Sequence, residues 1–489
     1  MKKLIIIILI FCSNYIYSSQ INGHVSLDNV SNKNGIIIKF KPLSPSSVYI
    51  ETVSNSKGFF NTTVINGLYN IVFEKIGFKT CILKNQFISR NRSLEYITLS
   101  SNKIINISGE IFGNWKNTNT YVVNGKSTIP IGETLNIEHG TEIKFDGYHS
   151  IIVNGNINAI GNESSYIKFT SNKLNPTNKD WNQIKINATS TNSEMKFCIV
   201  EYGKKDNGTG DGIINISGKL NIENCIIQHC DQTGIYAKDN LTDLDISNNN
   251  IVNCKYGIHI ETDKKIDIRG NKISNIRTSG ITVGPHSNSV KISNNKISNC
   301  EGYGIQSWSS ILINNNVLFD IGSKLNIYSI MIIGGKPEIR NNTIFNNSCG
   351  IGITGSKFFN PQPIIDSNIF YNNTYFGIRS EGNSMPQSVK YNLFKDNGIG
   401  IGNNLPIGVG TIITTNINGS NSDTFFNIFP LTNLRPTNSS ITNFQLLKLN
   451  SDAINAGNPS HRNEVDASII DIGANDFNEN IRNNQISEI

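Results

Sequence analysis

An all-β solenoid with a small β-sandwich at its N-terminal end is the fold class that this sequence predicts. The first observation is a unit of roughly 20 to 27 residues, repeated eight times, in which an asparagine stands two positions ahead of an apolar residue. The second is a Gly-Ile step further along most units, and the third is a set of short alternating strands before residue 100. One unit cannot bury its apolar face alone, so the units must stack on one another.

The repeated asparagines are expected to form a ladder in the turns between strands. Asparagine tolerates the left-handed backbone conformation, and its amide can bond the backbone and the amide of the next unit. A buried ladder amide without these bonds costs about 1 to 3 kcal/mol, so the predicted role is structural and not ligand binding. The predicted ladder comprises Asn224, Asn249, Asn271, Asn295, Asn315, Asn342, Asn368 and Asn392, with apolar partners Ile226, Ile251, Ile273, Ile297, Val317, Ile344, Phe370 and Phe394.

The N-terminal residues have the pattern of an export signal. Two lysines precede an apolar run, Leu4–Phe11, and small polar residues follow. This predicts a signal peptide over residues 1–19, with cleavage near Ser18 or Ser19. Cys12 leaves a lipoprotein anchor as an alternative, although the residues before it lack the small side chain that lipid transfer requires. No later run approaches the roughly 20 apolar residues that cross a bilayer, so no transmembrane segment is expected after signal removal.

The charge pattern does not favour a nucleic-acid partner. The net charge is +6 and the pI is about 8.7, yet the lysines and arginines are scattered along the chain. A weak preference for anionic polymers stays open.

The eight cysteines of the chain can form a disulfide framework if it is exported, but a chain of this size does not need one. Alignment of the units places Cys198 near Cys225, and Cys230 near Cys254 with Cys300 in the same row. Side chains stacked in this way point in the same direction, which favours small apolar residues packed in the interior. No CxxC pair or Cys/His spacing indicates a metal site.

Residues 20–100 are predicted to form the β-sandwich, because short alternating strands are separated there by Gly and Asn turns. The order of the segments that begin at Gly23, Asn55, Gly67 and Lys75 resembles the carboxypeptidase regulatory-like module of bacterial surface proteins. Such modules are spacers or stabilising appendages, so the resemblance implies no catalysis.

Residues 104–193 are expected to form an N-terminal cap and the first coils, and residues 194–404 the regular repeats. The segments Ile131–Gly140 and Ile167–Ser171 resemble the entry coils of secreted bacterial parallel β-helix proteins. The regular repeats resemble the right-handed parallel β-helix of the pectate-lyase-like superfamily. The resemblance implies three short strands and three turns in each coil, with equivalent residues of successive coils piled into ladders.

Residues 405–489 lose the period and are expected to cover the last coil, because an open edge invites association. The segments Ser451–Pro459 and Asp466–Asn475 resemble a closing segment common in secreted β-helix proteins. Asp466 and Asp471 are predicted to be turn and cap residues.

The Gly-Ile step also assigns outward-facing residues. Side chains alternate along a strand, so the residue after each Gly-Ile step and the second residue beyond it point outward. The two resulting outer columns are Tyr236, His259, Thr282, Gln306, Met331, Gly352 and Arg379, and Lys238, Glu261, Gly284, Trp308, Ile333, Thr354 and Glu381. Aromatic rings and planar polar groups on one face are suited to sugar recognition. The predicted ligand-binding residues are therefore Tyr236, Gln306, Trp308, Arg379 and Glu381.

A second outer face precedes each ladder asparagine and carries charged residues. Asp245 and Asp267 fall on neighbouring coils, where they can share a cation such as Ca²⁺ or be neutralised by Arg269 and Lys291. A solvated charged face is the simpler interpretation. Ca²⁺ is the one cofactor that the sequence suggests.

Candidates for catalysis are weaker. His259, beside Glu261 and Lys238, can act as an acid or base, although an exposed histidine in a sugar groove more often binds. The segment Ser279–His286 resembles the Asp-Pro-His signature of alginate epimerases on this fold, but Gly284 stands where their aspartate belongs. This leaves His286 without its carboxylate partner.

The predicted function is polysaccharide binding on an outer face of the solenoid, by a protein secreted to the extracellular space, the cell surface or the periplasm. Its partner would be a polysaccharide or a cell-surface glycan. One alternative is a polysaccharide lyase, epimerase or hydrolase of the pectate-lyase-like superfamily. Another is a structural adhesin without catalysis.

Overall fold

The computed structural model describes residues 17–43, 48–204, 211–238, 244–382, 384–402, 404–415, 421–429, 458 and 460, which contain strands and no helix. No helix able to cross a membrane occurs in these ranges. The chain divides into two compact units, one of Met1–Ile105 with Thr118–Thr120 and one of Asn106–Asn117 with Tyr121–Ile489. The positions of Cys12, Asp466 and Asp471 lie outside the described residues.

The first unit is a β-sandwich, as predicted. In one sheet β1 pairs antiparallel with β4 and parallel with β7 and β8; the other sheet has the order β3-β2-β5-β6. Phe40, Tyr69 and Phe73 are fully buried between the sheets. Ser18 and Ser19, the predicted cleavage positions, are paired in β1 with Ile65 and Val64. The strands of this unit are β1 (Ser18–Leu27), β2 (Ile37–Pro42), β3 (Ile50–Val53), β4 (Phe59–Ile65), β5 (Gly67–Glu74), β6 (Cys81–Ile88), β7 (Arg92–Ser93) and β8 (Ile97–Leu99).

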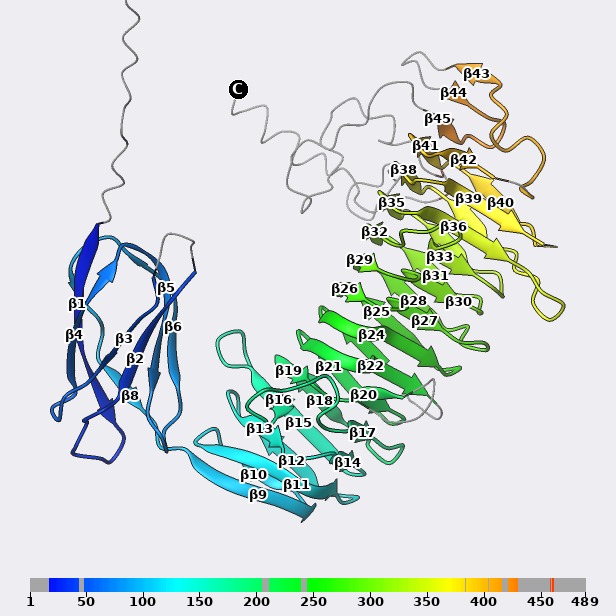
Figure 1. Ribbon diagram of the computed structural model, residues 1–489. Helices are drawn as coiled ribbons and strands as arrows, with labels where there is room; N and C mark the ends of the chain where they lie inside the picture. Colours follow the sequence, from blue (N-terminus) through cyan, green and yellow to red (C-terminus); the bar gives the residue numbers. More distant parts are fainter. Residues whose placement is uncertain are drawn as a thin grey trace, which may run out of the picture. The chain divides into compact units, whose positions relative to one another are not determined.

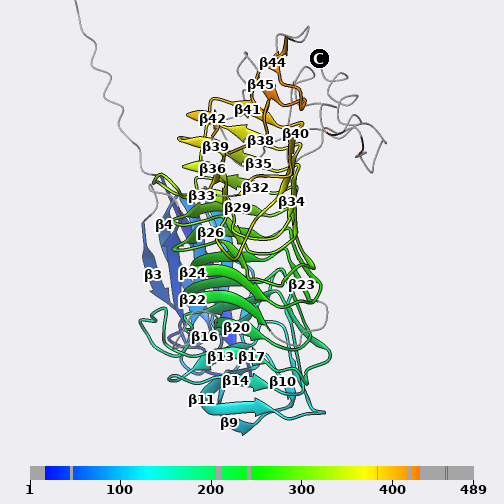
Figure 2. The same ribbon diagram turned by 90° about the vertical axis from the view of Figure 1, so that its right-hand side faces the viewer.

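The second unit is a solenoid of stacked coils with three parallel faces (Figures 1 and 2). Its first sheet contains twelve strands: β10 (Gly113–Trp115), β12 (Thr134–Ile137), β15 (Asn156–Ile160), β18 (Ser193–Lys196), β21 (Leu220–Glu223), β23 (Leu244–Ser247), β25 (Ile266–Arg269), β28 (Val290–Ser293), β31 (Leu312–Asn314), β34 (Glu338–Arg340), β37 (Ile364–Asp366) and β40 (Ser388–Lys390).

The second and third sheets are continuous through two long strands, β22 (Ile226–Lys238) and β24 (Asn250–Glu261), which turn from one face to the other. The other strands of the second sheet are β13 (Glu142–Phe145), β16 (Ile167–Ser171), β19 (Cys198–Glu201), β26 (Lys272–Ile276), β29 (Lys296–Cys300), β32 (Val317–Phe319), β35 (Thr343–Phe345), β38 (Ile369–Tyr371), β41 (Leu393–Lys395) and β45 (Ile428–Phe429). Those of the third sheet are β14 (Ile151–Val153), β17 (Ile184–Ile186), β20 (Gly212–Ile216), β27 (Ile281–Val283), β30 (Ile305–Ser307), β33 (Tyr328–Ile332), β36 (Cys349–Thr354), β39 (Phe376–Glu381) and β42 (Ile399–Ile401). The remaining strands are β9 (Lys103–Glu110), β11 (Asn119–Ile129), β43 (Thr414–Thr415) and β44 (Asn421–Ser422).

An asparagine ladder joins the first sheet to the second, and it differs from the prediction at two rungs. Its asparagines are Asn249, Asn271, Asn295, Asn316, Asn342, Asn368, Asn392 and Asn427, each at most 1% exposed. In each of the first seven, the backbone N–H and the side-chain amide donate to the amide oxygen of the next rung at 2.9–3.1 Å. The ladder therefore continues beyond Asn404, where the sequence analysis ended the regular repeats.

The two incorrectly predicted rungs, Asn224 and Asn315, are turn residues that stand one position before the true rungs. Their φ angles are 54° and 58°, in the left-handed region. The buried rungs are Cys225 and Asn316, and the inward apolar residues are Ile227 and Leu318. The same left-handed position precedes the other rungs, as at Asn248 and Asn294, because the chain must turn sharply between the two sheets.

The glycines of the Gly-Ile steps are explained by close approach between coils. A Cβ atom at Gly234, Gly280 or Gly304 would lie 2.6–2.9 Å from the carbonyl oxygen of the equivalent residue in the next coil. Backbone at this distance cannot give way as a flexible side chain can, so a Cβ at any of these three glycines would push the coils apart. The isoleucines that follow, such as Ile235, Ile258 and Ile281, are fully buried.

A second, shorter ladder joins the second sheet to the third and was not predicted. The side-chain amide of Asn347 donates to the amide oxygen of Asn373 at 3.0 Å. The side-chain amide of Asn373 donates in the same way to Asn397 at 2.8 Å. The corresponding positions of earlier coils include three cysteines and an isoleucine, since Cys230 pairs in register with Cys254 and Ile276 with Cys300. The seven cysteines of the described residues are all free. Burial raises the pKa of the Cys300 thiol to about 12, which favours an inert packing role.

Candidate functional site

The predicted outer columns lie on the third sheet, and the predicted register is confirmed. Tyr236 pairs with His259, His259 with Thr282, and the series continues through Gln306, Met331 and Gly352 to Arg379. In the second column Lys238 pairs with Glu261, and Thr354 with Glu381. Neighbouring coils therefore present these side chains at the strand spacing of about 4.8 Å.

Glu261 is the centre of a polar cluster on β22 and β24. Its carboxylate accepts a hydrogen bond from the Tyr236 hydroxyl and lies 3.1 Å from Nε2 of His259. The rings of Tyr236 and His259 meet edge to face with their centroids 5.1 Å apart. The Lys238 ammonium lies 5.7 Å from the centre of the Tyr236 ring. We call these four residues the Glu261 cluster.

Tyr236 does not present an open ring face, contrary to the prediction. The residue is only 3% exposed because its ring lies among His259, Lys238 and Glu261. Gln306 and Trp308 are half-buried on the same outer face, so they remain accessible. The predicted register placed these residues on the correct face of the sheet. The exposure of each aromatic ring, however, depends on contacts between neighbouring coils.

Burial lowers the pKa of His259 below its usual 6.5, and the nearby Glu261 carboxylate offsets this only in part. The imidazole is therefore neutral at pH 7. Because the unfolded chain protonates this histidine more readily, its contribution to stability is present above pH 6.5 and is lost as the pH falls toward the folded value. We expect the unfolding free energy of His259→Gln to fall less than that of the wild type between pH 7.5 and 5.

Chemical denaturation across this pH range measures the difference, with His139→Gln, at an exposed position, as the matched control. Equal pH dependence in the wild type and His259→Gln would mean that His259 protonates as readily in the folded protein as in the unfolded one.

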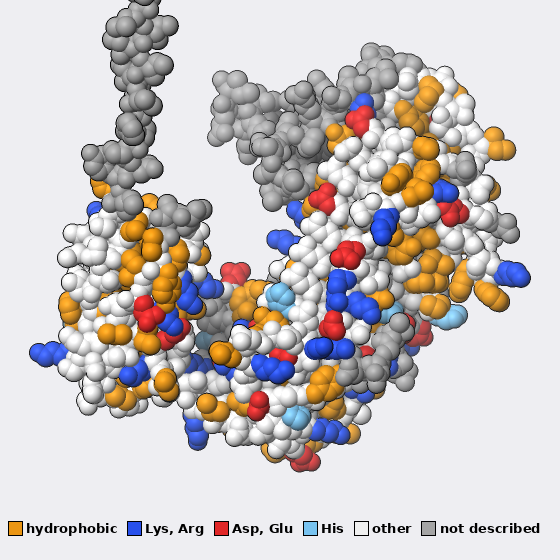
Figure 3. Space-filling model, viewed as in Figure 1, with side chains coloured by type: hydrophobic (Ala, Val, Ile, Leu, Met, Phe, Trp, Pro, Cys, Tyr) orange, Lys and Arg blue, Asp and Glu red, His pale blue; other side chains and the backbone are white. Residues whose placement is uncertain are grey.

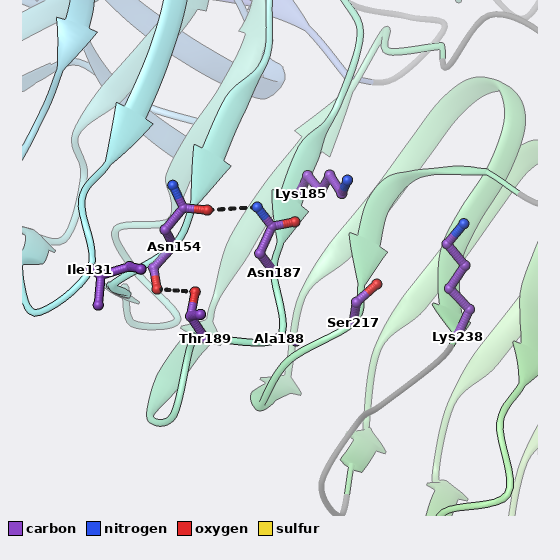
Figure 4. A pocket seen from close by; sticks show the side chains of 8 residues that line it. All are labelled: Ile131, Asn154, Lys185, Asn187, Ala188, Thr189, Ser217 and Lys238. Carbon is purple, nitrogen blue, oxygen red and sulfur yellow. Dashed lines mark hydrogen bonds between the residues drawn. The ribbon is translucent and has the colours of Figure 1, made fainter.

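An open groove of about 750 Å³ is lined by eight residues that include Lys238 (Figure 4). Its residue Lys185 continues the first outer column toward the first coils, because Lys185 pairs with Asn215 and Asn215 with Tyr236. Its lining residues are Ile131, Asn154, Lys185, Asn187, Ala188, Thr189, Ser217 and Lys238. Lys238 belongs to both the groove and the cluster, so the two form one continuous surface.

The groove is basic and rich in amides. Lys185 and Lys238 contribute two ammonium groups, and these eight residues include no Asp or Glu. The amide of Asn187 donates to Asn154 Oδ1 at 2.6 Å, and the Thr189 hydroxyl to the Asn154 carbonyl at 2.7 Å. These bonds hold the groove wall in place. By contrast, basic and acidic side chains are interspersed on the face of the β-helix seen in Figure 3.

Arg379 and Glu381 form a second polar cluster farther along the third sheet. Arg379 Nε lies 3.0 Å from Glu381, its Nη1 donates to Asn326 at 3.0 Å, and its guanidinium lies 4.7 Å from the centre of the Phe376 ring. The Tyr328 hydroxyl donates to Glu381 at 3.3 Å. Burial, with the Glu381 charge adding to it, raises the pKa of Tyr328 well above 10. We call these five residues the Glu381 cluster.

His286 is not joined to either cluster by a described hydrogen bond or ion pair. It is exposed in the turn after β27, at a φ of 68°. A Cβ at Gly284 would lie 3.0 Å from Cγ of Glu261, so an aspartate there would require a small shift of the Glu261 side chain.

Asp245 and Asp267 pair on β23 and β25 of the first sheet. Asp245 forms an ion pair with Arg269, and Asp267 lies 4.0 Å from Lys265. No group of three or more metal-ligating side chains occurs among the described residues. For Asp245 the pairing with Arg269 matches the predicted neutralisation, and the Ca²⁺ site stays a prediction.

Sequence reasoning missed Asn154, Lys185, Asn187, Ser217 and Tyr328. The first four belong to coils of irregular length, with 33 residues from Ile152 to Lys185 but 21 from Asn215 to Tyr236 by their numbering. The regular period therefore could not extend the columns backward. Tyr328 follows Asn326 and Ile327 in a unit without the Gly-Ile step, which was the signal used to set the register.

A protein-family model described as a right-handed beta helix region matches residues 211–361 and 266–416. Among solved structures, a cohesin–X-dockerin complex from Acetivibrio cellulolyticus matches at 16% identity over 17% of this chain and 58% of the other, with a TM-score of 0.14. A mutant of the periplasmic alginate epimerase AlgG matches at 14% identity over 61% of this chain and 78% of the other (TM-score 0.33). An alpha-1,3-glucanase catalytic domain in complex with nigerose matches at 14% identity over 80% and 87% (TM-score 0.36).

This chain spans only 58% of the cohesin–dockerin chain that it matches. The family match and the register of the described coils agree with each other, and together they show that the second unit has the right-handed parallel β-helix fold.

Proposed function

We propose that this protein binds an acidic polysaccharide on the outer face of its third sheet. The observation that supports the proposal is the continuity of the groove with the Glu261 cluster through Lys238. Two ammonium groups can neutralise carboxylate or sulfate groups of a glycan, while Asn and Thr side chains can bond its hydroxyls. A groove without acidic side chains among its lining residues suits an anionic polymer better than a neutral one.

The test is a binding titration with a panel of acidic and neutral polysaccharides. We expect an acidic member to bind, and Lys185→Gln and Lys238→Gln each to weaken its affinity roughly 10-fold, or about 1.4 kcal/mol. Lys291→Gln removes an exposed positive charge from the first sheet and is the matched control. Added salt should weaken wild-type binding because it screens the lysine charges.

A second candidate function, elimination or epimerisation of a uronate in such a polymer, is favoured by one observation. A neutral imidazole is held 3.1 Å from a carboxylate, next to the basic groove. Both reactions begin with removal of the proton on the carbon next to the sugar carboxylate; neutral His259 can accept that proton, and the lysines can stabilise the resulting anion.

Product analysis of the same titrations separates the two functions. Unsaturated or epimerised products that disappear in His259→Gln would make the protein an enzyme, whereas binding without turnover supports the first proposal. If no polysaccharide binds, the structural role without a ligand is favoured.

Export from the cytoplasm is part of the proposal, because the pattern of residues 1–19 predicts a signal peptide and the proposed ligand is an extracellular polymer. Mass spectrometry of the N-terminus of the exported protein tests it.

A further inference from the structure

The Glu261 and Glu381 clusters are built on the same plan. In each, a glutamate accepts a hydrogen bond from a tyrosine hydroxyl and contacts a basic side chain two residues earlier on the same strand. Both tyrosines are nearly fully buried, at 3% and 2% exposure, while the carboxylates stay open, at 45% and 35% exposure. The buried tyrosines hold the carboxylates in position, and the carboxylates stay accessible to solvent.

A glycine makes the second cluster possible. The Tyr328 ring crosses the coil that contains Gly352 before its hydroxyl meets Glu381. A Cβ at position 352 would lie 2.5–2.7 Å from three carbons of that ring. The absence of a side chain at this one position lets a residue from one coil bond a carboxylate two coils away.

The glutamate and the basic residue beside it lie, in both clusters, on the third sheet and in the same two columns. From His259 the first column passes through Thr282, Gln306, Met331 and Gly352 to Arg379, which is five steps. At about 4.8 Å per step the two clusters are roughly 24 Å apart along the solenoid axis. Between them the face presents the half-buried side chains of Gln306 and Trp308.

We propose that the two clusters are separate anchoring points for one polysaccharide chain, which runs along the solenoid axis between them. This inference rests on the proposed function and specifies its ligand as a polymer long enough to reach both clusters. The groove and Lys238 hold the anionic groups at one end. At the other end the Arg379–Glu381 pair offers a planar donor next to an acceptor, which suits neighbouring sugar hydroxyls.

Two anchors predict a dependence on chain length. A fragment much shorter than roughly 24 Å can occupy only one cluster. A longer one binds the second cluster at a high effective concentration, which can raise affinity by 10²- to 10⁴-fold. Removal of the distal anchor should therefore weaken long fragments and leave short fragments in the groove unaffected.

The experiment uses the full chain and the acidic polysaccharide that binds best in the panel, partly depolymerised and separated by size. Calorimetry with fragments well below and well above roughly 24 Å in extended length should give at least about 10-fold tighter binding for the longer ones. Arg379→Gln should lower the affinity of the longer fragments to that of the short ones. Glu381→Gln provides a second test of the distal cluster should Arg379→Gln fail to fold.

Arg269→Gln is the matched control, because it removes a guanidinium that also pairs with a carboxylate but lies on the first sheet. Equal affinity for short and long fragments, or no effect of either distal variant, would overturn the two-anchor inference while the proposed function stood. Failure of every polysaccharide to bind would overturn both.

Discussion

Asn295→Ala should destabilise the β-helix by about 4 kcal/mol. The Asn295 side chain accepts two hydrogen bonds from Asn271 and donates to the Ile268 and Ser293 carbonyls and to the Asn316 amide oxygen, at 2.9–3.1 Å. The alanine variant would leave the buried backbone N–H of Asn271 and the Ile268 carbonyl without these partners. Each buried polar group left unsatisfied costs about 1–3 kcal/mol.

Denaturant unfolding measures the loss, and hydrogen exchange at the Asn271 amide locates it. Asn294→Gly is the matched control, because Asn294 is exposed with a φ of 57° and glycine adopts that conformation readily. A similar loss of stability in both variants would mean that the turn, and not the ladder amide, carries the effect.

Asp423→Ala should have the second largest effect, about 3 kcal/mol, because Asp423 caps the ladder. Asn427 is the last rung, and its backbone and amide N–H groups both donate to the Asp423 carboxylate at 3.0 Å. The backbone N–H groups of Phe425 and Gly410 donate to the same carboxylate at 2.9 and 2.7 Å. Each earlier rung donates its backbone N–H and one amide N–H to the next rung in this direction, so a buried carboxylate completes the series as an anionic residue caps the N-terminus of a helix.

Hydrogen exchange should locate the damage in β41 and β45, which Asp423→Ala would open without loss of the earlier coils. Asp423→Asn should be nearly as harmful, because an amide cannot accept all the bonds that the carboxylate accepts. Asp396→Asn, at an exposed left-handed position, is the control for loss of charge. Unchanged exchange in β45 after Asp423→Asn would contradict the capping role.

The sequence was sufficient to predict the stacked coils, because spacing alone indicates which residues recur at one position. Two of the predicted rungs were wrong because of the residues next to them in the sequence. In the run Asn314-Asn315-Asn316 either of the last two asparagines fits the pattern, and at Cys225 the rung is not an asparagine at all. The left-handed turn residue and the ladder residue are adjacent and are both often asparagine, so composition cannot separate them.

The candidate site could be predicted only in part. The columns that contain His259, Glu261, Arg379 and Glu381 follow from strand alternation, and their register is confirmed. The burial of Tyr236 and the reach of Tyr328 across Gly352 depend on side-chain packing between coils, which no periodicity encodes. The groove was missed because its coils differ in length.

A crystal structure of the protein with a bound oligosaccharide from the best-binding acidic polymer would show where the glycan lies. We expect ligand density on the third sheet, with anionic groups at Lys185 and Lys238 and sugar rings continuing past Glu261 toward Trp308. Density over Asp245 and Arg269 on the first sheet, or on the N-terminal sandwich, with the groove empty, would contradict this expectation.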